Sequence, residues 1–315
     1  MCAADVPVRR ASEGVGARGR TPTTEFKYAT FMCEMIWKTI VVIVLCAFTV
    51  LSEVVPFDPV RGLVEVEVTI DGRVKATFGI DTGADRLYVD SAFARRHSLT
   101  FLRSPPQRPV VGIDGSSEAS FIDIRSLRIG KETLYNLRAT AINMDRIIKD
   151  KRLGYPDGLI GHDVLRRFYV TVDYPARTLR LQMEQPDFMK DHKDSSYRTV
   201  RFSTNRHLIL VNVTLDDSVT VPMILDYCAS YTSLSESLAS QLGLDLKEDK
   251  RQRVATMSIG DIVTSKNVPV VVTDLSQFKK SLRGAKFEGI VGASFLYRYK
   301  FTIDYKGKRI YVHNR

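Results

Sequence analysis

The sequence predicts an all-β fold, mainly strands with a few short helices, arranged as two related lobes. Two observations support this fold class. The chain repeats itself, because the segment that starts at Leu63 aligns without a gap to the segment that starts at Leu208. Both copies begin with β-branched residues that alternate with polar ones, and a period of two is typical of a half-buried strand. The chain therefore contains the same β unit twice.

The first repeated block predicts that each lobe opens with a β-hairpin. The alternating apolar residues are Val64, Val66, Val68 and Ile70 in the first copy and Ile209, Val211, Val213 and Leu215 in the second. Turn-forming pairs follow these runs, Asp71-Gly72 in the first copy and Asp216-Asp217 in the second, and such pairs favour a tight hairpin turn. An offset of 145 residues relates the two copies, so Asp81 corresponds to Asp226.

A second block repeats nearer the end of each half, at an offset of 131 residues. It starts at Asp157 in the first copy and at Glu288 in the second, and each copy contains an apolar-apolar-Gly triplet. The triplets are Leu159-Ile160-Gly161 and Ile290-Val291-Gly292. Two blocks that recur in the same order in both halves indicate an internal duplication.

These repeats set the expected domain boundaries. We expect lobe 1 over residues 60–182 and lobe 2 over residues 207–315, joined by a polar, irregular linker over residues 183–206. A short helix is expected over residues 236–242 in lobe 2, with Ser235 as its N-cap.

Residues 1–52 are expected to be a leader and not part of either lobe. The first thirty residues are rich in Ala, Gly, Arg, Thr and Pro and show no apolar period. Lys38 then precedes an apolar run over residues 39–52, which has the length, the positive flank and the small final residues of a signal peptide. A short membrane anchor formed by the same run is the alternative. Both interpretations place residues 53–315 in the periplasm or another extracytoplasmic space.

Charge and cysteine usage exclude several classes of function. The net charge is +10, but the basic residues are scattered and do not alternate with aromatic ones, so we expect no nucleic-acid partner. The four cysteines, Cys2, Cys33, Cys46 and Cys228, form no CxxC pair and have no histidine neighbours at metal-binding spacing. We therefore expect neither a metal site nor a cofactor.

The strongest functional motif is Asp81-Thr82-Gly83-Ala84, which follows an apolar strand. The triplet that ends at Gly161 lies some eighty residues later. Together with the hairpin and the duplication, this pattern resembles the retropepsin-like (clan AA) aspartic proteases, as a tandem-duplicated, exported member of the bacterial type. The resemblance covers most of residues 60–182 and, more weakly, residues 207–313. It implies two acid-protease lobes that form a pepsin-like pseudodimer.

The resemblance also implies an aspartic endopeptidase that acts on peptide or protein substrates. In that family each lobe supplies one aspartate, and the two carboxyl groups share a single proton because like charges so close cannot both ionise. The ionised member activates a water molecule, and the protonated member donates to the scissile carbonyl. The resemblance therefore assigns catalysis to Asp81 and Asp226, with support from Thr82, Gly83 and Ala84.

The second lobe departs from the family pattern, because Tyr227 and Cys228 stand where the family has Thr and Gly. This departure leaves three alternatives open. The first, which we favour, is a monomeric endopeptidase that needs both Asp81 and Asp226. The second is a protease-fold module that binds peptides without cleaving them. The third is a homodimer in which Asp81 of one chain pairs with Asp81 of another.

Lobe 1 is longer than lobe 2 between the two repeated blocks. The extra residues include Gly112-Ile113-Asp114-Gly115, which has the composition of a hairpin tip. The resemblance implies that this hairpin is the flap that covers substrate. One flap for two lobes is the arrangement of pepsin-like monomers, so it favours a monomer.

Overall fold

The computed structural model describes residues 54–59, 62–103, 109–111, 116–147, 154–190, 196–246, 251–260, 263–282 and 285–314. The expected leader (residues 1–52) and the expected flap tip (Gly112 to Gly115) lie outside these residues. Everything described belongs to one compact unit, Glu53–Arg315. Within the described part of the chain, no helix combines the length and apolarity needed to cross a membrane.

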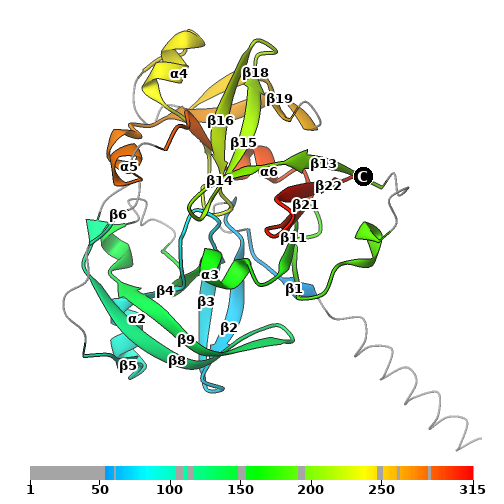
Figure 1. The fold of residues 1–315 in the computed structure, drawn as a ribbon. Coiled ribbons are helices and arrows are strands. Elements are labelled where there is room, and N and C mark those ends of the chain that lie inside the picture. Colours follow the sequence, from blue (N-terminus) through cyan, green and yellow to red (C-terminus); the bar gives the residue numbers. More distant parts are fainter. Residues whose placement is uncertain are drawn as a thin grey trace, which may run out of the picture. The chain divides into compact units, whose positions relative to one another are not determined.

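Lobe 1 is built around a closed β-sheet (Figure 1). Its strands follow the order β2-β3-β10-β4-β9-β8-β5, and an additional pairing between β2 and β8 closes the first six into a barrel. The strands are β2 (Glu65–Ile70), β3 (Val74–Ile80), β4 (Tyr88–Asp90), β5 (Thr100–Phe101), β8 (Ala119–Ile129), β9 (Glu132–Ile142) and β10 (Gly158–Ile160). Short helices α2 (Ser91–Arg96) and α3 (His162–Leu165) and the 3-10 helix η2 (Met144–Arg146) complete the lobe.

Lobe 2 repeats this arrangement. Its strand order is β14-β15-β16-β20-β17-β19-β18, and a β15–β18 pairing closes a second barrel. The strands are β14 (Ser203–Asn205), β15 (Leu208–Leu215), β16 (Val219–Leu225), β17 (Thr232–Leu234), β18 (Gln252–Ile259), β19 (Val263–Val272) and β20 (Gly289–Val291). The helices are α4 (Glu236–Gln241), α5 (Ser276–Ser281) and α6 (Ala293–Leu296). The predicted fold class, a mainly β protein of two related lobes, is confirmed.

The turn residues and the N-cap residue that the sequence predicted adopt the expected conformations and contacts. At the β2–β3 turn, Asp71 and Gly72 adopt φ angles of 51° and 68°, and at the β15–β16 turn Asp216 and Asp217 adopt 47° and 54°. These left-handed conformations suit the twist of a tight hairpin, and they favour Gly, Asn and Asp. The Ser235 hydroxyl accepts a hydrogen bond from the Leu238 amide at 3.2 Å, which makes it the N-cap of α4 as expected.

A third sheet contains strands from both halves of the chain. Its order is β1-β12-β11-β21-β22-β13, with β1 (Val54–Pro56), β11 (Tyr169–Asp173), β12 (Thr178–Gln182), β13 (Tyr197–Arg201), β21 (Lys300–Asp304) and β22 (Arg309–His313). At its centre β11 pairs antiparallel with β21, and Thr171 lies opposite Thr302. These two threonines are equivalent in the sequence repeat, and their Oγ1 atoms lie 2.8 Å apart. The approximate twofold axis of the duplication therefore passes between them.

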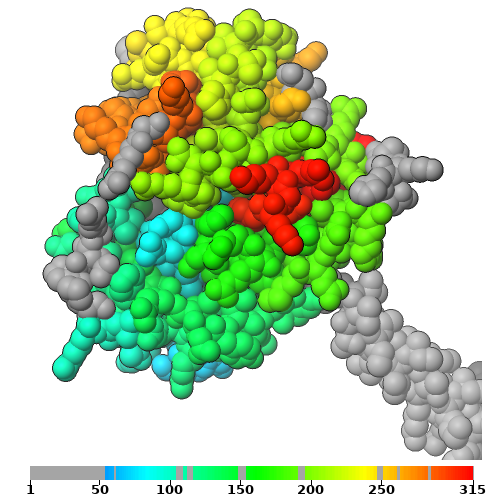
Figure 2. All heavy atoms as spheres, viewed as in Figure 1, coloured from blue at the N-terminus to red at the C-terminus, as the bar shows by residue number. Residues whose placement is uncertain are grey.

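The segment expected to be an irregular linker, residues 183–206, contains regular structure. It holds a 3-10 helix, η3 (Asp187–Met189), and two strands, β13 and β14. β13 pairs with β22 at the edge of the shared sheet, and β14 pairs with β15 of lobe 2. Because both are edge strands with polar residues, their sequence shows no clear apolar alternation. In Figure 2 red residues near the C-terminus reach the molecular surface, although the central residues of β22 are buried.

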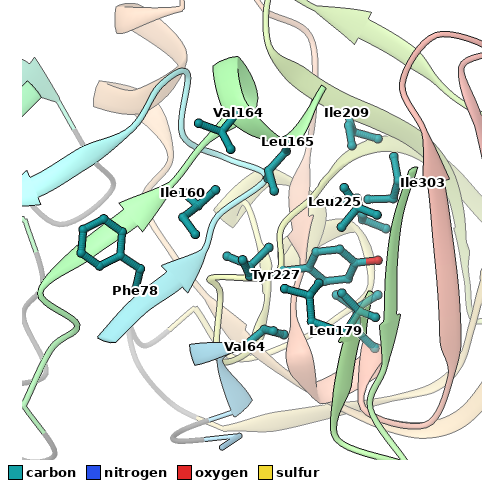
Figure 3. Close-up of a cluster of buried hydrophobic side chains, with 14 of the residues drawn as sticks. Val64, Phe78, Ile160, Val164, Leu165, Leu179, Ile209, Leu225, Tyr227 and Ile303 are labelled. Atoms are coloured by element: carbon teal, nitrogen blue, oxygen red, sulfur yellow. The ribbon is translucent and has the colours of Figure 1, made fainter. Parts of the chain in front are cut away.

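One hydrophobic core joins the two lobes. It includes Val64, Phe78 and Ile160 from lobe 1, Ile209, Leu225 and Tyr227 from lobe 2, and Leu179 and Ile303 from the shared sheet (Figure 3). Tyr227 is the largest of its fully buried side chains. Because apolar burial is the main force that holds lobes together, we expect the two lobes to fold as one unit.

The Thr171–Thr302 contact gives a stability prediction. Thr171→Val keeps the shape of the side chain but leaves the buried Thr302 hydroxyl with one partner fewer, since that hydroxyl also lies 2.8 Å from His313 Nε2. We expect the free energy of unfolding of residues 53–315 to fall by about 1 kcal/mol in urea titration. Thr171→Ser, which keeps the hydroxyl, is the matched control for the hydrogen bond. Equal or greater stability of the valine variant would contradict the assignment.

Candidate active site

Asp81 lies in a short loop that directly follows β3. Its own amide donates to the Ile160 carbonyl at 3.0 Å, so strand β10, which contains the first two residues of the Leu159-Ile160-Gly161 triplet, anchors the start of the loop. Its Oδ1 accepts hydrogen bonds from the amides of Gly83 at 2.8 Å and Ala84 at 2.9 Å. The side chain is buried, with 9% of the residue exposed. The loop therefore holds the carboxylate in one orientation and offers it two donors.

Asp226 occupies the equivalent place after β16. Its amide donates to the Val291 carbonyl at 3.0 Å, so the second triplet supports this loop in the same way. Its Oδ1 accepts the Cys228 amide at 2.7 Å. This bond is equivalent to the one from the Gly83 amide to Asp81, although the residue is a cysteine.

The two aspartates lie at one site. A Cβ atom added at Gly83 would lie 2.9 Å from Asp226 Oδ2 and 3.2 Å from Asp81 Oδ1. Such contacts are shorter than van der Waals separation, so only glycine fits at this position without displacing a carboxylate. The backbone of the first loop therefore approaches both acidic side chains, and a single chain brings them together.

Thr82 connects the two loops across the lobe boundary. Its hydroxyl donates to the Leu225 carbonyl at 2.8 Å and accepts the Tyr227 amide at 3.1 Å. The residue is fully buried, with 1% exposed. Because one hydroxyl both donates and accepts, it fixes the backbone on each side of Asp226 relative to Asp81.

Tyr227 does not reproduce the bonds of Thr82 in the opposite direction. Its ring lies in the shared core, near Leu179, Leu225 and Ile303 (Figure 3). Its hydroxyl finds no hydrogen-bond partner among the described residues, and burial raises the pKa of this phenol well above its usual value. In lobe 2, hydrophobic packing of Tyr227 therefore takes the place of the hydrogen bonds that Thr82 makes in lobe 1.

The Cys228 side chain is partly buried beside the aspartates. It packs against a cluster formed by Ala84, Tyr88, Ile142, Met144 and Leu159. Val110 packs against the same cluster. This residue belongs to β6 (Val110–Val111), which pairs antiparallel with β7 (Ser116–Ser117). The two short strands flank the expected flap tip, which stays a prediction because it lies outside the described residues.

Burial and mutual repulsion govern the protonation of the two aspartates. Burial is the largest cause that raises the pKa of Asp81 well above its usual value, and the negative charge of Asp226 raises it further. Burial also raises the pKa of Asp226 to about 6, although the amides of Cys228 and Gly83 oppose this shift. The pair therefore retains a proton at pH values where an exposed aspartate is fully ionised.

The structure adds residues that sequence reasoning did not identify. His207, which precedes β15, places Nε2 2.9 Å from the Gly83 carbonyl oxygen. Asp85 accepts hydrogen bonds from the Tyr88 hydroxyl at 2.5 Å and from the Arg86 guanidinium at 2.9 Å. The duplication gave no signal for them, because Gly62 stands at the position equivalent to His207 and Ser230 at the position equivalent to Asp85. Within the described ranges, no three side chains of His, Cys, Asp or Glu gather as a metal ion would require.

A family model described as aspartyl protease matches residues 66–164 and again residues 211–295. The two matches together span more than half of the chain and coincide with the two lobes. The chain therefore belongs to the aspartyl protease family, as a tandem-duplicated member of its retropepsin-like branch. Comparison with curated proteins found no match.

The raised pKa of Asp226 predicts how stability depends on pH. A group whose pKa is higher in the folded state than in the unfolded state favours folding while it is protonated, and this contribution is lost as pH rises through the folded value. For Asp226 the loss falls between about pH 4 and about pH 6. Asp226→Asn cannot ionise. We therefore expect the variant to gain up to about 3 kcal/mol relative to wild type on going from pH 4 to pH 7.

Urea unfolding of residues 53–315 at the two pH values measures this difference. Asp123→Asn, on the exposed face of β8, is the control and should show no comparable pH-dependent gain. A stability difference between wild type and Asp226→Asn that is the same at both pH values would contradict the assigned burial of the carboxylate.

Proposed function

We propose that residues 53–315 form an aspartic endopeptidase in which Asp81 and Asp226 of one chain share a proton and activate water. The observation that carries this proposal is the position of Gly83, whose Cα has room for no side chain because the carboxylates of both aspartates lie next to it. Membership of the aspartyl protease family supports the reaction class.

The proposed reaction follows from the shared proton. The ionised carboxylate takes a proton from a water molecule as the water oxygen attacks the carbonyl carbon of the scissile peptide bond. The protonated carboxyl group donates to the carbonyl oxygen, so no free oxyanion forms in the buried site. The resulting gem-diol collapses when the proton gained from water passes to the amine nitrogen and the C–N bond breaks. As the carbonyl re-forms, a gem-diol hydroxyl returns its proton to the other carboxylate, so both carboxyl groups return to their starting state.

The apolar cluster beside the aspartates supports a preference for an apolar residue next to the scissile bond. The cluster itself is buried, but Val110 from lobe 1 and Cys228 from lobe 2 pack against it and are only partly buried, so they offer apolar atoms from both lobes. An extended peptide presents alternate side chains to opposite faces, so one apolar side chain could contact this cluster while its neighbours point away.

Two other functions compete with this proposal. Tyr227 favours a module that binds peptides without cleaving them, because its hydroxyl makes no hydrogen bond among the described residues to match those of Thr82. A protease that pairs Asp81 from two chains is opposed by Asp226, which already occupies the place beside Gly83.

Cleavage assays separate these three functions. Purified residues 53–315 are incubated with a diverse peptide mixture between pH 3 and pH 7, and new termini are identified by mass spectrometry. We expect cleavage by wild type and by the surface control Asp123→Asn, and a loss of about a hundredfold or more in both Asp81→Asn and Asp226→Asn. Full activity of Asp226→Asn would support pairing between chains. Binding of peptides without cleavage at any pH would support the non-catalytic module.

We also propose that the chain is exported, with the apolar run 39–52 as its signal peptide and cleavage after Ser52. The support is the order of positive flank, apolar run and small residues. When the full chain is expressed in a bacterium, the mature protein should be periplasmic and begin at Glu53 in N-terminal sequencing. Ile43→Arg, which interrupts the apolar run, should remain uncut in the cytoplasm. An uncut protein in the membrane fraction would support the anchor instead, and an uncut cytoplasmic wild type would contradict export.

A further inference from the structure

His207 reaches the catalytic loop of the opposite lobe. It lies just before β15 in lobe 2, yet its Nε2 atom is 2.9 Å from the carbonyl oxygen of Gly83 in lobe 1. A carbonyl oxygen can only accept a hydrogen bond, so Nε2 carries the proton and donates. The contact joins residues that are 124 positions apart in the sequence.

The bond from His207 continues to Asp81 through one peptide unit. The carbonyl of Gly83 and the amide of Ala84 belong to the same peptide group, and that amide donates to Asp81 Oδ1 at 2.9 Å. A hydrogen bond to the oxygen of a peptide polarises the group and strengthens its N–H as a donor. A stronger donor stabilises a carboxylate more than it stabilises a neutral carboxyl group.

The equivalent residue of the first repeat cannot supply such a bond. The position equivalent to His207 is Gly62, which has no side chain, adopts a φ angle of +82° and would bring an added Cβ into contact with Ala293. The amide equivalent to that of Ala84 also differs, because the Ala229 amide points to the backbone oxygen of Asp226 at 3.5 Å. The polarised peptide therefore distinguishes Asp81 from Asp226.

Several charged groups face His207 and influence its protonation state, but the hydrogen bond to Gly83 does not depend on that state. Asp85, Arg86 and Arg206 act on its charge, and burial is the main cause that lowers its pKa. His162, itself close to Arg166, faces it from α3. Either protonation state of His207 can carry a hydrogen on Nε2, so the bond to Gly83 persists when the imidazole gains a second proton.

We propose that His207 is a positioning residue that holds the Gly83–Ala84 peptide in place and, through it, stabilises the ionised form of Asp81. Burial and the charge of Asp226 act in the opposite direction and disfavour ionisation of Asp81, so the bond from His207 limits that effect. The proposal rests on the proposed function for its catalytic consequence, because the pair must lose one proton before either carboxyl group can act as the base. Removal of the Nε2 donor should make ionisation of the Asp81–Asp226 pair less favourable. The acid limb of the pH–activity profile should then move to higher pH.

The test compares three variants of residues 53–315. His207→Phe keeps a ring without a donor, His207→Gln keeps a donor near the Nε2 position, and His162→Leu removes the neighbouring imidazole but not the bond. The carboxylate carbons of protein labelled with ¹³C-aspartate are titrated by NMR, and the signals are assigned with Asp81→Asn and Asp226→Asn. We expect the first ionisation of the pair to move up by about half a pH unit in His207→Phe. His207→Gln and His162→Leu should stay close to wild type.

Activity provides the second measurement. The acid limb of kcat/KM should move by the same amount in His207→Phe, with little change in KM at the pH optimum. Because the NMR titration needs no turnover, it tests the role of His207 even if wild type cleaves no peptide, an outcome that would remove only the proposed function. No shift in His207→Phe, or an equal shift in His207→Gln, overturns the proposal. If His207→Phe does not fold, His207→Leu takes its place, and failure of both while His207→Gln folds also overturns it.

Discussion

Two carboxyl groups buried side by side repel each other when both are ionised, and this repulsion is the constraint on which the site depends. The fold must hold Asp81 and Asp226 together in spite of it. Amide donors partly offset the cost, from Gly83 and Ala84 to Asp81 and from Cys228 to Asp226. A proton retained by the pair removes the remaining repulsion between the carboxylates. The same proton is required for acid–base catalysis of peptide-bond hydrolysis.

Most of the elements that hold the two carboxyl groups in place are equivalent in the two lobes, and a few differ between them. The equivalent strands β10 and β20 support the two loops, and the Thr171–Thr302 contact lies near the approximate axis. The two loops that carry Asp81 and Asp226 are not equivalent in their contacts. Thr82 makes both hydrogen bonds across the boundary, whereas Tyr227 contributes a buried ring. Polar positioning in one lobe and apolar packing in the other thus hold the same pair of loops.

Much of the fold could be predicted from the sequence because its signals are local and occur twice. The hairpin turns need residues that tolerate a left-handed backbone, and Asp71 and Asp216 are such residues. The duplication made Asp226 the counterpart of Asp81, and the resemblance to the aspartic proteases implied that the two loops meet. The strands in residues 183–206 could not be predicted, since polar edge strands lack an apolar period. His207 could not be predicted either, because its partner is 124 residues away and no motif marks it.

The central claim is that one chain builds one complete two-carboxylate site. The most direct measurement is the stoichiometry with which residues 53–315 bind a non-cleavable peptide whose scissile carbonyl is replaced by a hydroxymethylene group. Isothermal titration calorimetry gives the ratio, and analytical ultracentrifugation gives the mass of the complex. The account predicts one ligand per monomer, with proton exchange on binding at a pH near 6. One ligand per two chains, together with the mass of a dimer, would contradict it.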